Sequence, residues 1–359
     1  MQHSMMEKRI HSFTFLVFPA LLVFLQMAAI SLPQQAVAAN AYVGPNGQIY
    51  MGDSLPRELL DKGYVPMGSR RESLYPTHGK FKDFMWKVSS STTTVYILGS
   101  VHTARSNVYP LPDGIENAFD GCSVLAVEAD LNPGKLMRNA VDITREILRG
   151  ITYPGGDTIE NHISAHTYAL AKARLETFGV SMDQAKYFRP WVLASMVEGL
   201  SDMGEGFSVN YGIDKHFMDE AAGKKRIVEL EGIAFQINLF NNLSGKEEEA
   251  MLLGTLNEKQ GELKTLLSYW AVGNAARINA LIYGDIEKNP DMASFYKKFL
   301  WDRNRGMAEK IEKFLDGREK VFVVVGAAHL VGDKGVLSLL RQKGYKVEQM
   351  ESEARPASF

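Results

Sequence analysis

The segment 320–325, Lys-Val-Phe-Val-Val-Val, is the feature of the sequence that most restricts the fold. After its first residue the segment is continuously apolar, and most of it is β-branched valine, so it is expected to form a strand. A strand with no polar face must be covered on both sides, which is typical of parallel sheets that carry helices on each face. The segment therefore predicts an α/β protein with a largely parallel sheet.

Further strand-like segments, all short and rich in apolar residues, are spread along the chain. They cover residues 84–88, 94–98, 124–127, 226–230 and 345–349. A Ser/Thr-rich turn separates the first two segments, which are expected to pair as a hairpin. A helix predicted at 334–343 connects the valine-rich strand at 320–325 to the strand at 345–349, and it fits a right-handed crossover.

Helical patterns dominate the sequence between these strands. A short helix is expected at 113–119, and residues 131–205 and 245–315 are expected to be mostly helical. The predicted architecture is a mixed, largely parallel central sheet flanked by helices, with a helical insertion at about 131–205. The compact domain is expected to span 81–350, followed by a tail of 351–359.

The N-terminal residues 1–39 resemble an export signal. Basic Lys8 and Arg9 precede an almost wholly apolar stretch at 13–30, and the small residues Ala36-Val-Ala38 follow it. The apolar stretch is long for a signal, so it is either cleaved or retained as a membrane anchor. We therefore expect an exported, periplasmic or extracytoplasmic protein that is held at the inner membrane only if the signal stays uncleaved.

Residues 40–80 are rich in Pro, Gly and charge, and are expected to form a peripheral lead segment with a hairpin around Pro45-Asn-Gly47. The whole chain has 40 Lys and Arg against 42 Asp and Glu. Without a concentrated basic face, a nucleic-acid partner is not expected. Cys122 is the only cysteine of the sequence, so no intramolecular disulfide can form, and its place before an apolar strand is typical of a small core residue.

Two motifs of the same form follow two of the predicted strands. Gly99-Ser-Val-His102 follows the second strand, and Gly326-Ala-Ala-His329 follows the valine-rich strand. Each glycine permits a sharp exit from its strand, and each histidine comes three residues later. Because open α/β sheets bind ligands beyond the carboxyl ends of their strands, both histidines are expected to enter one crevice.

Acidic residues occupy the equivalent place on two further strands. Glu128 and Asp130 follow the strand at 124–127, and Glu229 and Glu231 lie at the end of the fourth strand-like segment. Two histidines with one or two carboxylates are a common ligand set for Zn, Mn, Co or Fe, with positions left open for water and substrate. A cation bound in this way lowers the pKa of its water and polarises a carbonyl group.

Other interpretations of these residues stay open. A histidine after a strand often only hydrogen-bonds a backbone carbonyl, and neighbouring acids at a strand end are often solvated. A serine hydrolase is disfavoured, because Ser100 lies beside His102 in a tight loop and no Gly-x-Ser-x-Gly elbow is present.

Three further histidines are set aside. His162 and His166 have the i,i+4 spacing of a helical metal pair, but they fall at a predicted helix start with little acidic support. His216 is expected in a helix capped by Asp214, where it would have a packing or surface role.

A set of short motifs is distributed over nearly the whole predicted domain. They are Tyr96-Ile-Leu-Gly-Ser-Val-His102, Tyr109-Pro-Leu-Pro112, Val127-Glu-Ala-Asp130, Arg189-Pro-Trp191, Gly212-Ile-Asp214, Val228-Glu-Leu-Glu231, Gln236, Arg303-Asn304 and Val325-Gly-Ala-Ala-His329-Leu-Val-Gly332. Together, over about residues 90–350, they resemble the TraB/PrgY/GumN family. The chain departs from that pattern at Gly232, where the family more often has a hydroxyl residue.

The TraB/GumN family is similar to the Tiki metalloproteases, and more distantly to erythromycin esterases and haem-binding ChaN-like proteins, so the resemblance implies their α/β fold. It also implies that His102, His329 and Glu128 hold a divalent metal ion such as Mn, Co or Zn. Glu231, or whichever carboxylate stays off the metal, is then expected to act as the general base. Arg303 is expected to orient the substrate, with a salt bridge on a helix as the alternative.

The function implied by the resemblance is that of a metal-dependent hydrolase, and most of all a peptidase acting on peptides or unfolded protein segments outside the cytoplasm. Two functions of other kinds stay open. One is a protein that binds and sequesters a peptide or haem without cleaving it. The other is an accessory factor in envelope polysaccharide production.

Overall fold

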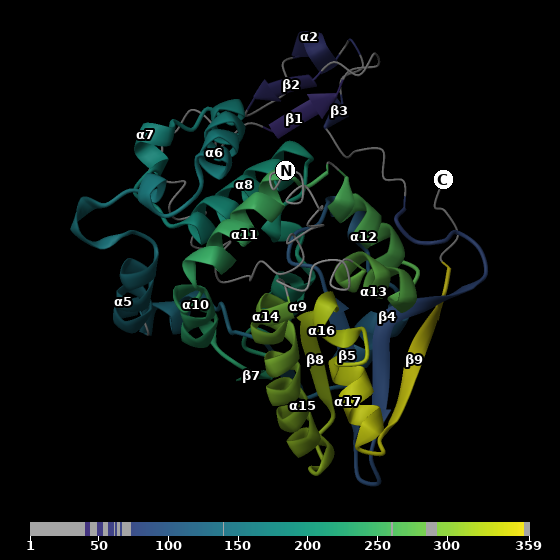
Figure 1. Cartoon of the computed structure of the whole chain (residues 1–359). Helices are drawn as coiled ribbons and strands as arrows, with labels where there is room; N and C mark the ends of the chain where they lie inside the picture. Colours follow the sequence, from purple (N-terminus) through teal and green to yellow (C-terminus); the bar gives the residue numbers. More distant parts are fainter. Residues whose placement is uncertain are drawn as a thin grey trace.

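Figure 1 shows the computed structural model of the chain. The structure describes residues 40–43, 49–52, 57–60, 62, 65–66, 73–138, 140–259, 261–284 and 293–354. The predicted export signal at 1–39 lies outside the described residues, as does the end of the predicted tail.

A six-stranded sheet forms the centre of the fold, with the strand order β7-β6-β8-β5-β4-β9. Its strands are β4 (Lys80–Ser89), β5 (Thr94–Ser100), β6 (Val124–Val127), β7 (Arg226–Glu229), β8 (Val321–Gly326) and β9 (Lys346–Glu353). The pairs β5–β8, β8–β6 and β6–β7 are parallel, whereas β4 is antiparallel to both β5 and β9. The predicted α/β class with a mixed, largely parallel sheet is confirmed, as is the β4–β5 hairpin.

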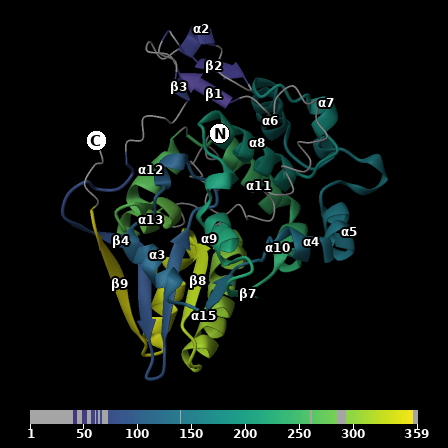
Figure 2. The same cartoon turned by 180° about the vertical axis from the view of Figure 1, so that it is seen from behind.

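The valine-rich strand β8 lies inside the sheet between β5 and β6, and all of its residues are buried. Helices cover both faces of the sheet, with α15 and α17 on one side and α3 and α9 on the other (Figures 1 and 2). These helices are α3 (Asp113–Asp120), α9 (Ile213–Ala221), α15 (Asp302–Leu315) and α17 (Val336–Gln342). The double cover explains why β8 can be apolar throughout.

The last strand, β9, pairs with β4 at the edge of the sheet rather than with β8. The connection through α17 therefore passes over β5 and β4. The register between β4 and β9 shifts between Lys82 and Trp86, where Asp83 is buried and accepts a hydrogen bond of 2.8 Å from Ser352 Oγ.

Helices fill the chain between β6 and β7 and between β7 and β8. Besides α9 and α15 they include α4 (Pro133–Arg138), α5 (Ala140–Gly150), α6 (Ala165–Thr177), α7 (Met182–Ala185), α8 (Pro190–Gly204), α10 (Ile233–Asn241), α11 (Gly245–Leu256), α12 (Glu262–Trp270), α13 (Ala275–Tyr283) and α14 (Ala293–Tyr296). The helices before β7 continue past the predicted limit near residue 205, as far as α9. Both figures show α8 and α11 side by side.

One large apolar core joins the sheet to these helices, and it includes the fully buried Trp191 and Trp270. A second, small cluster of Ile143, Ile147 and Ile237 lies between α5 and α10. Cys122 is buried in the main core, and burial raises the pKa of its thiol to about 11. Its predicted role as a core residue is confirmed.

A separate three-stranded sheet, with the order β2-β1-β3, precedes the main domain. Its strands are β1 (Asn40–Val43), β2 (Ile49–Gly52) and β3 (Val65–Pro66). The antiparallel pairing of β1 and β2 confirms the predicted hairpin, although its turn lies outside the described residues. Within the described ranges, no helix combines the length and the apolar character needed to cross a membrane.

Candidate active site at the carboxyl ends of the strands

The register of the parallel strands brings the predicted site to one edge of the sheet. Val325 of β8 pairs with Gly99 of β5, and Val324 pairs with Val127 of β6. The loops that carry His102, Glu128 and His329 therefore begin at the same edge of the sheet. This is the place where ligands bind in open α/β sheets.

His102 is held by Asp214, which lies in the first turn of α9. His102 Nδ1 lies 2.8 Å from Asp214 Oδ2, and Ser100 Oγ donates to Oδ1 of the same carboxylate at 2.7 Å. Burial lowers the pKa of His102, but the charge and hydrogen bond of Asp214 outweigh it, so the net shift is upward. Burial raises the pKa of Asp214, and the charge and hydrogen bonds of its partners reverse this to a net decrease. Because Nδ1 faces the carboxylate, Nε2 is the ring atom left for a ligand.

His329 belongs to the short helix α16 (Ala327–Leu330), and its ring is oriented by Asn304. His329 Nδ1 lies 2.6 Å from Asn304 Oδ1, and Asn304 Nδ2 donates to the carbonyl oxygen of Lys334 at 2.8 Å. This second bond turns the amide oxygen toward the ring, so Nδ1 carries the proton and Nε2 keeps a lone pair. Burial and the charge of Arg303 hold the pKa of His329 well below its ordinary value, so the ring is neutral at pH 7.

The carboxylate of Glu128 is buried between the second histidine and a guanidinium group. Its Oε1 accepts from the Gly326 N–H at 2.7 Å and lies 3.7 Å from His329 Nε2. Its Oε2 accepts from Arg303 Nη2 at 2.7 Å and from Gln236 Nε2 at 3.1 Å. One oxygen thus faces the histidine, and the other is fixed by two donors.

Arg303 bridges Glu128 and Glu231 in the interior of the protein. Its Nε donates to Glu231 Oε1 at 2.8 Å and its Nη2 donates to Oε2 at 2.7 Å. Its Nη1 donates to Phe299 O at 3.0 Å, in the π-helical turn Lys297–Trp301 that precedes α15. Burial lowers the pKa of Arg303, but the two glutamates more than offset it. The structure therefore brings Glu231 to Arg303 rather than to the histidines.

Gly326 forms the floor of a space between the two histidines and Glu128, which we call the cradle. A methyl group on the Gly326 Cα would lie 3.3 Å from Glu128 Oε1, 3.6 Å from His102 Nε2 and 3.6 Å from His329 Cδ2. In the part of the chain that the structure describes, no three His, Cys, Asp or Glu side chains are placed so that they could hold a metal ion. The donor types at the cradle, two imidazoles and a carboxylate, are nevertheless those that Zn, Mn and Co favour.

Two of the acids singled out in the sequence lie outside the cradle. Lys135 Nζ lies 2.5 Å from Glu229 Oε2 and 3.6 Å from Asp130 Oδ2. Glu229 Oε1 also accepts from the Asp130 N–H at 2.8 Å. These residues form an ion cluster at the ends of β6 and β7.

The histidines that were set aside also lie elsewhere. His162 precedes α6 and its Nε2 lies 2.8 Å from Asp157 Oδ2, whereas His166 lies within that helix. His216 Nε2 lies 3.3 Å from Glu116 Oε1. The prediction that Asp214 caps this helix is wrong, because the N-cap of α9 is Gly212 and the Asp214 carboxylate is directed to His102 and Ser100 instead.

Asp214, which the sequence suggested only as a helix cap, and Asn304 are site residues whose contacts with the histidines were not predicted. Their presence in the motifs Gly212-Ile-Asp214 and Arg303-Asn304 is the signal that could have found them. Gly212 is needed because a Cβ at this position would collide with the carbonyl oxygen of His102. Gly232, where the chain departs from the family pattern, has a φ of 107°, which favours glycine.

The family model described as TraB/PrgY/gumN matches residues 84–349, a span that contains the whole cradle. The chain belongs to the TraB/PrgY/gumN family. The chain is similar to "Uncharacterized protein YbaP" of Escherichia coli. The two are 25% identical over 251 residues, which cover 68% of this chain and 87% of YbaP. An "Uncharacterized protein" of Treponema pallidum is 22% identical over 287 residues, covering 72% of this chain and 80% of its own length. No solved structure matches the chain.

Proposed function

We propose that this TraB/PrgY/gumN protein is a metal-dependent hydrolase with its active site at the cradle. The observation that supports the proposal best is the convergence of His102 Nε2, Glu128 Oε1 and the His329 ring on one point beside Gly326. Each histidine has its Nδ1 occupied by a buried partner, Asp214 or Asn304. Metal-binding histidines are oriented in this way in known sites.

In this proposal His102, His329 and Glu128 hold a divalent cation such as Mn, Co or Zn. When bound, such a cation polarises a substrate carbonyl and lowers the pKa of a water molecule. The two imidazoles contribute Nε2 lone pairs, which requires His102 to release the proton that Asp214 favours.

Arg303 is proposed to hold Glu128 in position through Oε2, leaving Oε1 directed at the cradle. Gln236 strengthens this arrangement because its Nε2 donates to both Glu128 and Glu231. The general-base role of Glu231 stays a prediction, and its contacts favour a supporting role instead. Both oxygens of Glu231 already accept hydrogen bonds from the Arg303 guanidinium.

Peptides or unfolded protein segments outside the cytoplasm are the proposed substrates. Two sequence features support this part of the proposal. The motifs resemble those of the Tiki metalloproteases, and residues 1–39 have the pattern of an export signal.

The experiment that tests the proposed activity is incubation of the purified protein with a peptide library, followed by mass spectrometry. Cleavage products are expected with Mn²⁺, Co²⁺ or Zn²⁺ and not with a chelator, and Glu128→Gln should abolish them. Asp219→Asn, on the exposed side of α9, is the matched control and should keep full activity. Recovery of intact bound peptide with no products under any of these conditions would overturn the proposal in favour of a binding protein.

A further inference from the structure

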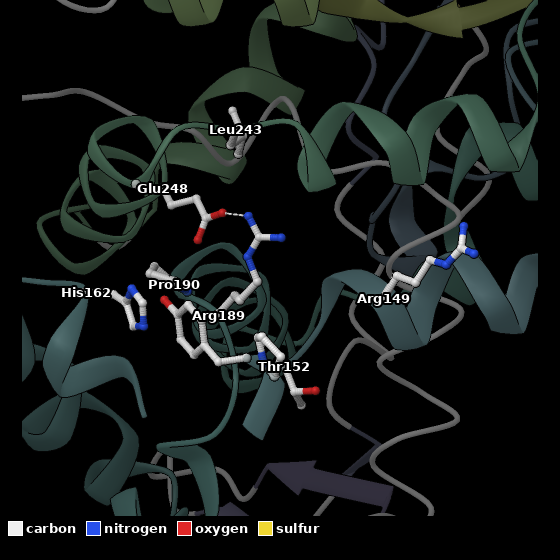
Figure 3. A pocket seen from close by; sticks show the side chains of 10 residues that line it. Arg149, Thr152, His162, Arg189, Pro190, Leu243 and Glu248 are labelled. Atoms are coloured by element: carbon white, nitrogen blue, oxygen red, sulfur yellow. Dashed lines mark hydrogen bonds and ion pairs between the residues drawn. The ribbon is translucent and has the colours of Figure 1, made fainter. Parts of the chain in front are cut away.

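A second site lies among the helices, lined by residues that do not overlap with the cradle. A cavity of about 240 Å³ is bounded by the segment that follows α5, by the start of α8 and by the start of α11 (Figure 3). Arg189 and Glu248 line it, together with Tyr153, His162 and Arg149. A cavity of this volume is at the small end of the range for ligand sites and suits about one amino-acid residue.

Arg189 is the most buried cation of this cavity, and its side chain is 17% exposed. One of its Nη2 hydrogens is donated to Glu248 Oε1, and the Glu248 side chain is only 3% exposed. Among the described residues, no other acceptor for the Arg189 guanidinium is found. Figure 3 shows one end of this guanidinium on Glu248 and the other end turned away from it.

The comparison with Arg303 shows what the Arg189 site lacks. Arg303 binds two carboxylates and a backbone carbonyl, so its buried guanidinium is well satisfied. Arg189 binds a single carboxylate although it is also largely enclosed. A guanidinium has five N–H donors in a planar fork that matches a carboxylate. The open end of Arg189 is therefore suited to a second carboxylate supplied by a ligand.

Part of the remaining cavity wall is flat or apolar. The rings of Tyr153 and His162 stack with their centroids 3.8 Å apart and their planes inclined by 7°. Pro190 and Leu243 add apolar surface. These walls would cover an apolar or aromatic group attached to the carboxylate.

We propose that this cavity binds a carboxylate carried on an apolar or aromatic group of about one residue, such as the C-terminal residue of a peptide. A phosphate dianion is disfavoured, because the negatively charged Glu248 would lie close to it on the same guanidinium. The repulsion grows with the charge of the ligand, so a dianion is repelled more strongly than a carboxylate. This inference does not depend on the proposed hydrolase activity.

Calorimetric titration of the purified protein with N-acetyl-L-phenylalanine tests the proposal. Binding is expected, whereas N-acetyl-L-phenylalanine amide should bind at least about tenfold more weakly, since it cannot form the charged hydrogen bonds. Inorganic phosphate should also bind more weakly than the carboxylate. Equal binding of the amide, tighter binding of phosphate, or no binding of the carboxylate would each overturn the proposal.

Three variants locate the site. Glu248→Gln removes the carboxylate that competes for Arg189 and is expected to tighten binding by about threefold or more. The double variant Arg189→Gln/Glu248→Gln avoids an unpaired buried charge and should weaken binding by about tenfold or more.

Arg305→Ala is the matched control, because Arg305 does not line the cavity and its side chain is 62% exposed. Its effect should stay within about twofold. Circular dichroism melts establish that each variant is folded. Weaker binding by Glu248→Gln, or equal losses in the Arg305 and Arg189 variants, would contradict a site on Arg189.

Discussion

His102 Nδ1 and Asp214 Oδ2 lie 2.8 Å apart in the interior, although 112 positions separate the two residues in the sequence. The contact joins the loop after β5 to the first turn of α9, and it determines which ring nitrogen of His102 faces the cradle. Ser100 Oγ fixes the second oxygen of the same carboxylate. The orientation of one predicted ligand thus depends on an acid from a distant helix.

Asp214→Asn should weaken metal binding at the cradle by about 10- to 100-fold, because the partner that orients the His102 ring loses its charge. Isothermal titration calorimetry of the variant and the wild type measures the change. Asp219→Asn is the control, since Asp219 lies on the same helix but forms an exposed ion pair with Lys215 at the surface. Unchanged affinity in the Asp214 variant would show that this carboxylate does not position a ligand.

The Gly326→Ala variant should fold, but its methyl group should fill the cradle. The φ of Gly326 is −51°, which alanine adopts readily, and the nearest atom to the new methyl group is Glu128 Oε1 at 3.3 Å. We expect a loss of about 1 kcal/mol in the free energy of unfolding and a loss of metal binding of at least about tenfold.

Gly306→Ala is the control for this substitution, because nothing lies within 4 Å of its added Cβ in α15. It should stabilise the helix by about 0.5–1 kcal/mol and leave metal binding unchanged. Urea denaturation and calorimetry separate the two effects. Normal metal binding by Gly326→Ala would rule out the cradle as the site.

Arg303→Ala should destabilise the protein by about 3–5 kcal/mol, because it leaves Glu128 and Glu231 buried without their shared cation. The side chains of these three residues are all less than 10% exposed. Arg305→Ala, two positions later, removes only a surface pair with Asp302 and should change stability by less than about 0.5 kcal/mol. Urea denaturation of both variants provides the comparison, and similar small changes in the two would contradict the assigned role of Arg303.

Asp83 should make the stability of the protein fall as the pH rises. Burial raises the pKa of its carboxyl from 3.8 to about 6, against the opposing hydrogen bond from Ser352. The folded state therefore binds this proton more tightly than the unfolded chain, so the stability that Asp83 contributes is full below pH 3.8 and is lost as the pH rises through about 6.

Asp83→Asn has no such proton, so its stability relative to the wild type should increase between about pH 4 and pH 6. Urea denaturation at several pH values measures this difference. The exposed Asp120→Asn is the control and should follow the wild type. Parallel curves for Asp83→Asn and the wild type would contradict the assignment.

The sheet and the paired histidine motifs could be predicted because their determinants are local. The apolar run of β8 specifies a strand covered on both faces, and glycine followed by histidine at the ends of two parallel strands specifies a shared edge. Glu128 follows from the same argument. The strand order could not be derived, because nothing local indicates that β9 pairs with β4.

The contacts that orient the histidines depend on tertiary structure, so they could not be predicted from the sequence pattern. Asp214 sits in a first helical turn, where acidic residues are common for purely local reasons. Asn304 follows an arginine on a helix that carries several charged residues, and only the packing of α15 against β5 and α17 brings it to His329. The bridge from Arg303 to two glutamates likewise joins segments that are far apart in sequence.

Calorimetric titration of the purified protein with Mn²⁺, Co²⁺ and Zn²⁺, beside the His102→Ala/His329→Ala double variant, tests the central claim most directly. The account predicts that the wild type binds about one cation per chain and that the folded double variant binds none at the same concentrations. Absence of binding by the wild type, or equal binding by the double variant, would contradict a metal site at the cradle.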